Sequence, residues 1–289
     1  MKPLIIGSGK LGMQIAGLFG RATVTTTKAP GEASYSDNIE VAQYCSGVQS
    51  ETHHSQNVLI ELIKKHNLIF VVVSPNKAKL GGLSFNSNFY DVFNTTYDQT
   101  TKEVASAVQH NPQAKVVYIS AHTVYGDSAT AVNENSELHP IHKCAQILIN
   151  AEKNIKMCPR HLIMRLGWIV RTEEHWKNFV AAMAQTYTFP GDGSSRGNFV
   201  HIEDILSAIQ FLLDNNAEGI YNVVNDCHMK WSDLFECISK KYNIGSVKWD
   251  PALENKWFEG DHIAENTKIK SEGFKFLRPD YCGIDNTEE

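Results

Sequence analysis

The chain has 289 residues and a mass of 32.3 kDa, with 42% hydrophobic residues, 20% charged residues and a formal net charge of -5. This composition is typical of a water-soluble globular protein, and a negative charge without any Lys/Arg block excludes a nucleic-acid-binding class. The apolar runs, such as 68–73, are of strand length, so we also expect no membrane partner.

The start of the chain and its cysteines indicate a cellular compartment. The first apolar strand follows Met1 within three residues, which leaves no room for a cleaved signal. We therefore expect a cytoplasmic protein. The cysteines contain no C-x-x-C pair, so we expect free thiols in a reducing compartment. They lie at positions 45, 144, 158, 227, 237 and 282.

The first half of the chain alternates segments with the patterns of strands and helices. This order predicts a parallel sheet that is covered on both faces. A third strand is only weakly indicated, around Val48, and 81–94 resembles a loop rich in Gly, Asn and Ser. The predicted strands are 3–6, 22–27, 68–73, 115–120 and 161–166, and the predicted helices are 10–19, 58–66, a segment ending near 109, and 141–155.

The second half has a different character, with more aromatic residues and a glycine-rich loop over 189–197. We predict helices over 168–187, 204–214 and 231–242 and a strand over 220–224. The fold prediction is an α/β, Rossmann-type doubly wound parallel sheet with a smaller, interleaved C-terminal substrate lobe. The main domain would contain 1–166, with 198–225 returning to it, and the lobe would contain 167–197 and 226–289.

The strongest motif is the turn Gly7-Ser8-Gly9-Lys10-Leu11-Gly12, which follows a strand and begins a helix. In such a G-x-G-x-x-G turn, the first glycine allows a tight turn and the second allows the backbone to approach a pyrophosphate. The third allows the helix to pack closely on the sheet. The helix N-terminus supplies free N–H groups for the phosphates. These six residues predict a nicotinamide dinucleotide site; the alternative is a purely structural turn.

Two further positions bear on the cofactor. An NAD site usually has an Asp or Glu after the second strand, where this chain has Thr27 and Lys28. A hydroxyl and a cation suit a 2′-phosphate, so we predict NADP, with NAD as the less favoured alternative; Lys28 could also be an ordinary surface lysine. Ser74 and Pro75, after the fourth strand, would contact the cofactor or form a simple turn.

Several motifs occur in a fixed order over nearly the whole chain. They are 117–126 (VYISAHTVYG), 165–167 (RLG), 198–204 (NFVHIED), 219–224 (GIYNVV) and 273–283 (GFKFLRPDYCG). In this set the chain resembles the extended and atypical short-chain dehydrogenase/reductases, the NAD(P)-dependent epimerase/dehydratase family. The spacing of the glycine turn and the tail resemble its YeeZ-like branch.

The resemblance implies a Ser-Tyr-Lys triad, but this chain departs from it at all three positions. Ala121 stands at the serine position, His142 at the tyrosine position and Gln146 at the lysine position. His142 could replace the tyrosine as the proton-transfer group or simply begin a helix. We assign Ala121 and Gln146 to the cofactor site, and Thr123 and Tyr125 remain as hydroxyls beside the crevice, although the tyrosine of this motif is more often structural.

The resemblance also implies residues around the substrate. Arg196, in the glycine-rich loop, and Arg171 could each hold a substrate anion or be solvated. His201 and Asp204 match a motif that orders the return from strand to helix. No His or Cys spacing typical of a metal site occurs, so we expect no metal.

Two function classes remain open. The first is an NADP-dependent oxidoreductase or epimerase/dehydratase that acts on a small hydroxylated or nucleotide-sugar-like metabolite. The second is a non-catalytic NADP-binding sensor or regulator, which the altered triad favours. The expected partners are a small-molecule substrate and, at most, a second copy of the chain in a homodimer.

Overall fold

The computed structural model describes residues 2–28, 35–47, 55–75, 87–128, 131–253 and 261–284. Val48, where a third strand was expected, lies outside these residues. The chain divides into two compact units, which are each described separately below. The first contains Met1–Ser120, Gln146–Met164 and Asn216–Ile220, and the second contains Ala121–Ala145, Arg165–Asn215 and Tyr221–Glu289. The predicted domain limits stay a prediction.

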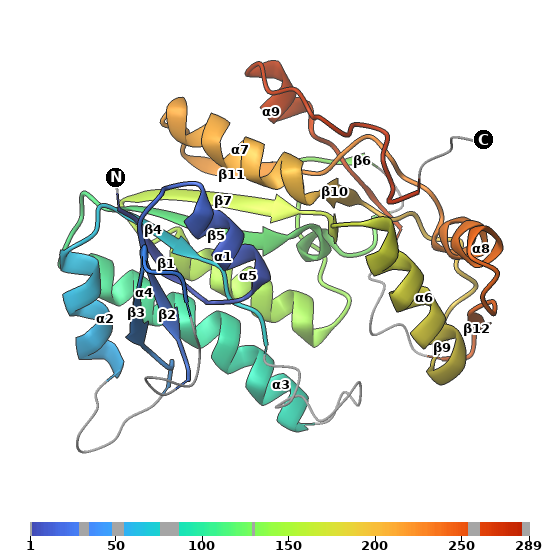
Figure 1. Cartoon of the computed structure of the whole chain (residues 1–289), viewed down its shortest axis with the longest axis horizontal. Coiled ribbons are helices and arrows are strands. Elements are labelled where there is room, and N and C mark those ends of the chain that lie inside the picture. Colours follow the sequence, from blue (N-terminus) through green and yellow to red (C-terminus); the bar gives the residue numbers. More distant parts are fainter. Residues whose placement is uncertain are drawn as a thin grey trace. The chain divides into compact units, whose positions relative to one another are not determined.

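A seven-stranded sheet forms the centre of the Rossmann-type fold (Figure 1). Its strand order is β11-β7-β5-β4-β1-β2-β3, and β3, β2, β1, β4 and β5 are paired in parallel. This order confirms the predicted α/β class with a doubly wound parallel sheet. The strands are β1 (Leu4–Ile6), β2 (Ala22–Thr26), β3 (Ile39–Gln43), β4 (Leu68–Val71), β5 (Lys115–Ala121), β7 (Arg160–Leu166) and β11 (Gly219–Val223).

The alternation of side chains along β1 explains why both faces of the sheet are covered. Leu4 and Ile6 point into a large apolar cluster with residues of helices on one face, such as Leu59 and Val104. Ile5 points to the opposite face, where its side chain lies below Gly12 of the first helix. The helices are α1 (Lys10–Gly17), α2 (Ser55–Lys64), α3 (Ser87–Asn94), η1 (Thr95–Gln99), α4 (Thr100–Val108) and α5 (Lys143–Ile155).

Two expectations for the first half need correction. The strand after β2 is Ile39–Gln43, an edge strand whose side chains are half exposed, and this explains its weak apolar signal. The expected loop over 81–94 becomes helix α3 from Ser87 onward. Apolar residues of α3 include Phe89, Tyr90 and Phe93, whose aromatic rings contact one another. These contacts stabilise a helix that Ser and Asn disfavour locally.

The second unit consists of helices and three small parallel sheets, β8–β10, β9–β12 and β6–β13. Its core is aromatic, with Trp176, Phe199, Trp231 and Phe235 in mutual contact. Its elements are η2 (His122–Tyr125), β6 (Ala131–Val132), β8 (Trp168–Val170), α6 (Glu173–Thr186), β9 (Thr188–Pro190), β10 (Phe199–His201), α7 (Ile202–Asp214), α8 (Trp231–Lys241), β12 (Lys248–Asp250), β13 (Ile263–Ala264) and α9 (Thr267–Ser271).

The second unit corrects two further expectations. The helix predicted over 168–187 starts only at Glu173, because Trp168–Val170 pairs in parallel with β10 as strand β8. The prediction of free thiols is wrong for one pair, since Cys227 and Cys282 are joined as a disulfide. The remaining four cysteines form no disulfide in the described part of the chain.

Buried asparagines fasten the C-terminal segment inside the second unit. The Asn198 amide donates to the His262 carbonyl (3.0 Å) and accepts from the Ala264 N–H (2.8 Å). Asn222 donates to the Glu265 carbonyl (2.9 Å). These side chains satisfy backbone groups that burial would otherwise leave without partners. The segment 262–265 is therefore part of the core of this unit.

No helix in the described part of the chain is both long and apolar enough to span a bilayer.

Candidate functional site

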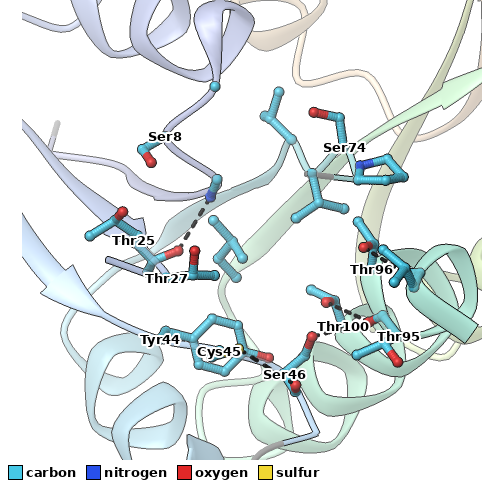
Figure 2. A pocket seen from close by; sticks show the side chains of 18 of the residues that line it. Ser8, Thr25, Thr27, Tyr44, Cys45, Ser46, Ser74, Thr95, Thr96 and Thr100 are labelled. Atoms are coloured by element: carbon cyan, nitrogen blue, oxygen red, sulfur yellow. Dashed lines mark hydrogen bonds between the residues drawn. The ribbon is translucent and has the colours of Figure 1, made fainter. Parts of the chain in front are cut away.

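A cavity of about 480 Å³ opens in the first unit at the carboxyl ends of β1, β2, β3 and β4 (Figure 2). This size suits a small-molecule or cofactor ligand. Its wall combines the glycine turn, the end of β2, the segment after β3 and one face of the α3–η1–α4 helix. The lining residues are Ile6, Gly7, Ser8, Gly9, Thr25–Lys28, Tyr44–Ser46, Val72–Pro75, Asp91, Val92, Thr95, Thr96 and Thr100.

Two glycines of the turn are required by the fold itself. Gly7 has a φ of +119°, and a Cβ there would lie 2.2 Å from the Val72 carbonyl oxygen. A Cβ on Gly12 would lie 2.1 Å from the Gly7 carbonyl oxygen. The turn therefore closes only because neither residue has a side chain. The Gly7 N–H donates to the Thr25 hydroxyl (3.2 Å), which ties the turn to β2.

Gly9 differs from these two glycines. Its φ of -70° and ψ of 174° are open to any residue, and a Cβ would find only the Ser74 hydroxyl, at 4.0 Å. No contact with a described residue thus explains the missing side chain. Gly9 is also the N-cap of α1 and provides no side-chain cap, so the first N–H groups of the helix lack that acceptor. An anion beside Gly9 would find both open space and N–H donors.

The end of β2 forms a second polar part of the cavity. Thr27 and Lys28 are exposed and line it, and the Lys28 N–H donates to the Thr26 hydroxyl (3.3 Å). Among the described lining residues, Lys28 and Asp91 are the charged ones, and Asp91 belongs to α3. The carboxylate typical of an NAD site is therefore missing from the described end of β2.

Tyr35 was missed by sequence reasoning, because it lies in a stretch without any periodic pattern. Its side chain hydrogen-bonds with Ser8 of the glycine turn and with Thr26 of β2, and Lys28 lies nearby. These two hydrogen bonds, together with the Lys28 charge, lower the pKa of the Tyr35 phenol. Tyr35 thus links the glycine turn to the end of β2.

On the other side of the cavity, the Glu103 carboxylate holds the segment after β3 and the neighbouring helix together. Glu103 accepts hydrogen bonds from the Tyr44 hydroxyl (2.6 Å), the Gly47 N–H (2.9 Å) and the Gln99 amide (2.8 Å). Burial and the Glu103 charge raise the pKa of Tyr44, so the phenol keeps its proton. The segment after β3 is thereby held against the helix that contains Gln99.

That helix runs from α3 through η1 into α4, and η1 is a π-helical turn. The Ser46 hydroxyl donates to the Thr95 carbonyl (3.0 Å), which also accepts from the Thr100 hydroxyl (3.3 Å). Figure 2 shows Ser46, Thr95, Thr96 and Thr100 on the side of the cavity that faces Ser8 and Thr27. Hydroxyl groups therefore line both sides of the cavity, and π-helical turns are frequent at functional sites.

The structure brings together most of the predicted cofactor residues. Gly7, Ser8, Gly9, Thr27, Lys28, Ser74 and Pro75 all line the cavity. Lys10, Leu11 and Gly12 form the first turn of α1 behind it. Gln146 is exposed on α5, where its amide donates to Asn150 (3.1 Å).

Ala121, Thr123 and Tyr125 belong to the second unit. Ala121 ends β5, and η2 begins at the next residue. Tyr125 is fully buried; its hydroxyl donates to the Asn222 amide oxygen (2.7 Å), and the Arg165 guanidinium lies 4.8 Å from its ring. Burial raises the pKa of Tyr125, although Arg165 acts against this. The geometry favours a packing role for Tyr125, whereas Thr123 is half-buried.

His142 also belongs to the second unit and precedes α5. Its Nδ1 accepts a hydrogen bond from the Cys144 N–H (2.9 Å), so the imidazole caps the first turn of the helix. A neutral ring with Nδ1 as acceptor carries its proton on Nε2. The same contact is compatible with both readings of His142, as a helix cap and as a proton-transfer group.

The two arginines proposed for the substrate have different surroundings. Arg196 forms a paired contact with Asp261, at 2.8 and 2.9 Å, and is about one-third exposed. Arg171 is half-buried, and burial lowers its pKa. Its carbonyl lies 3.2 Å from Nε2 of His201. An anion that binds to Arg196 must therefore compete with Asp261.

Three histidines that the sequence did not single out lie together in the second unit. His122 Nδ1 is 3.0 Å from His262 Nε2, and the Asn198 amide approaches the same nitrogen of His122 at 3.5 Å. Burial lowers the pKa of His122, of His262 and of His228. His262 and His228 lower the pKa of His122 further, and His228 does the same to His262. No cluster of His, Cys, Asp or Glu in the described residues is arranged to hold a metal ion.

Comparison with known proteins gives the class. The family described as RmlD substrate binding domain matches residues 94–257, more than half of the chain. The chain therefore belongs to the RmlD-like, NAD-dependent epimerase/dehydratase family of short-chain dehydrogenase/reductases.

A curated relative and two solved structures illustrate the likeness. The protein YeeZ of Escherichia coli strain K12 is 24% identical over 286 residues, with 96% of this chain and 97% of YeeZ covered. The Bacillus cereus UDP-glucuronic acid 4-epimerase, in complex with UDP-glucuronic acid and NAD, has a TM-score of 0.71 at 16% identity, covering 97% of this chain and 94% of the epimerase. Human epimerase family protein SDR39U1 with NADPH has a TM-score of 0.72 at 15% identity, covering 97% and 96%. The two structures share the fold.

The histidine cluster predicts a loss of stability in acid. A histidine whose pKa is lowered in the folded state resists the proton that the unfolded chain accepts near pH 6.5. The free energy of unfolding should therefore be highest above that pH and fall as the pH decreases below it. The charged groups that act on these rings are Asp127, Asp226, Asp261 and Arg196; the carboxylates favour protonation, but burial outweighs them.

Denaturant unfolding between pH 8 and pH 5 would measure this effect. In His122→Asn, the free energy of unfolding should depend less on pH, because one imidazole with a lowered pKa is removed. Val124→Ala, at a neighbouring buried position, should lower stability by the same amount at every pH. An unchanged pH dependence in His122→Asn would show that the cluster is not responsible.

Proposed function

We propose that this protein binds NADP in the cavity of the first unit and acts as an oxidoreductase or epimerase/dehydratase on a small hydroxylated or nucleotide-sugar-like metabolite. The observation that carries the proposal is Gly9. Its missing side chain serves no contact with the residues that the structure describes, and it stands at the N-terminus of α1 beside Ser74. A pyrophosphate at this position explains the glycine.

The preference for NADP rests on the end of β2. Lys28 offers a positive charge, and Thr27 and Tyr35 offer hydroxyl groups, in the part of the site where NAD-binding members use a carboxylate. The Tyr35 side chain hydrogen-bonds with Ser8 of the glycine turn and with Thr26 of β2, which places this phenol close to both parts of the site. Solved structures of the same fold contain either NAD or NADPH, so the fold itself is compatible with both.

The substrate class follows from family membership and from the arginines. The Bacillus cereus structure contains UDP-glucuronic acid, an anionic nucleotide sugar. Arg171 and Arg196 are the groups that we propose for a substrate anion in this chain. Arg196 would have to leave Asp261 to bind such an anion. Proton transfer would fall to His142, with Thr123 as a further hydroxyl; the hydride would move to or from the nicotinamide.

A second candidate function has its own support. Ala121 lacks a hydroxyl, His142 already caps α5, and Gln146 is bonded to Asn150. A chain with these three substitutions could bind NADP as a sensor or regulator without turnover. The experiments below separate the two functions.

Gly9→Ala should abolish tight dinucleotide binding but leave the fold intact. The new methyl group occupies the space of the pyrophosphate, so affinity should fall by about tenfold or more, while Tm should change by about 2 °C or less. Gly7→Ala is the matched control, because it meets the Val72 carbonyl and should lower Tm as well. Fluorescence titration and thermal unfolding measure both. Unchanged affinity in Gly9→Ala would contradict the site.

Lys28→Ala should discriminate between the two cofactors. Loss of a charged contact to the 2′-phosphate should weaken NADP binding by roughly tenfold to a hundredfold, with little change for NAD. Lys65→Ala removes the same charge from an exposed position outside the cavity and should change neither affinity. Isothermal titration at two salt concentrations provides the measurement. Equal losses for NAD and NADP would refute the preference for NADP.

His142 is tested by separating its two roles. Incubation with NADP or NADPH and a panel of nucleotide sugars, aldehydes and ketones would be followed by the absorbance of the reduced nicotinamide. If turnover occurs, His142→Ala and His142→Asn should both reduce kcat by about a hundredfold or more, because neither side chain transfers a proton. Asn can still cap the helix, so full activity in His142→Asn would leave His142 a capping role only. Tight NADP binding without turnover across the panel would favour the sensor.

A further inference from the structure

Cys227 and Cys282 are 55 residues apart in the sequence, and their Cα atoms lie 5.9 Å apart, within the range of disulfides. Cys227 follows β11 and is half-buried, whereas Cys282 lies near the end of the described chain and is 4% exposed. Both belong to the second unit, in its aromatic core cluster. One sulfur of the pair therefore lies on a partly accessible residue, and the other is shielded.

The two segments are held together by contacts that do not involve sulfur. The Asn225 amide donates to the carbonyls of Tyr281 (2.6 Å) and Arg278 (3.4 Å), and the Asp226 N–H donates to the Pro279 carbonyl (2.7 Å). The Asn225 side chain also accepts from the Cys227 N–H (3.1 Å), which fixes the position of that cysteine.

A second set of hydrogen bonds holds the C-terminal segment at residues 277 and 278. The Asp204 carboxylate accepts hydrogen bonds from the N–H groups of Leu277 (2.5 Å) and Arg278 (3.3 Å). None of these contacts involves a sulfur atom, so reduction of the bond removes none of them directly. The thiols of Cys227 and Cys282 would thus remain opposite each other at high effective concentration, which favours an internal disulfide over two mixed disulfides.

We propose that Cys227 and Cys282 form a reversible thiol–disulfide exchange site, which uses small disulfides such as oxidised glutathione as oxidant. The Cys227 thiolate attacks the small disulfide, forms a mixed disulfide and releases one thiol. The Cys282 thiolate then attacks the Cys227 sulfur and releases the second thiol. Two protein thiols are oxidised, one small disulfide is reduced to two thiols, and the same steps in reverse open the bond.

The Cys227–Cys282 bond holds residues 282–284 against the buried indole of Trp176. Gly283 lies so close to Trp176 of α6 that a Cβ would be 2.2 Å from two atoms of the indole ring. Trp176 is 3% exposed and contacts Phe199 and Trp231. Reduction would release residues 282–284 from this position, while Asn225 and Asp204 retain 277–281. The change would therefore be local and leave the fold of the unit in place.

The experiment equilibrates the full-length protein with reduced and oxidised glutathione at a series of ratios, followed by acid quenching, alkylation and peptide mass spectrometry. We expect a linked Cys227–Cys282 peptide whose fraction rises smoothly with oxidant and returns on reduction. Amides at 282–284 should exchange hydrogen faster in the reduced protein. Glutathione bound at either cysteine as the main product, both thiols free at every ratio, or a bond that never reduces would each overturn the proposal.

Three variants make the result specific. Cys227→Ser should abolish the linked peptide, whereas Cys237→Ser, at a half-buried free cysteine, should leave it unchanged. Asn225→Ala removes the hydrogen bonds that hold the two cysteine segments together but leaves both sulfurs in place. The disulfide should then be less stable, so the ratio of reduced to oxidised glutathione at which half of the protein is oxidised should change by roughly tenfold, towards more oxidising conditions. If this glutathione ratio is the same in Asn225→Ala as in the unchanged protein, the role assigned to the Asn225 hydrogen bonds is wrong.

Discussion

The close approach of backbone to backbone at the first glycine turn is the constraint on which the cofactor site depends. Gly7 lies against the Val72 carbonyl and Gly12 lies against the Gly7 carbonyl, so β1, β4 and α1 meet with no side chain between them. This packing places the N-terminus of α1 at the carboxyl end of the sheet. Gly9, which no contact among the described residues requires, lies at this N-terminus, where we propose that a ligand reaches the helix N–H groups.

The opposite wall of the cavity depends on a different kind of interaction. Glu103 holds the segment after β3 through Tyr44 and Gly47, and Ser46 binds the carbonyl of Thr95 in the π-helical turn. Charge-assisted hydrogen bonds in a buried setting keep this wall rigid. The cavity is thus formed by backbone packing on one side and by a carboxylate network on the other, and hydroxyl groups line both.

Family membership favours an enzyme, whereas the residues at the expected catalytic positions favour a protein without the usual catalytic chemistry. The RmlD-like family is one of NAD-dependent epimerases and reductases, yet this chain has Ala121, His142 and Gln146 where the family pattern has hydroxyls and a lysine. Tyr125 is used to pack against Arg165 and Asn222. His142 is the imidazole left at these positions, and its contact with Cys144 orients the ring so that, in the neutral form, Nε2 carries the proton and is a hydrogen-bond donor.

The sequence by itself determined the sheet and the glycine turn, because buried strands and a G-x-G-x-x-G turn leave local patterns. It also placed Thr27, Lys28 and Ser74 at strand ends, which parallel topology brings to one edge. Only the tertiary structure decided the edge strand at 39–43, the strand at 168–170, the contacts of Tyr35 with the glycine turn and β2, the histidine cluster and the Cys227–Cys282 bond. These features depend on contacts between residues far apart in the chain, and such contacts leave no periodic signal in the sequence.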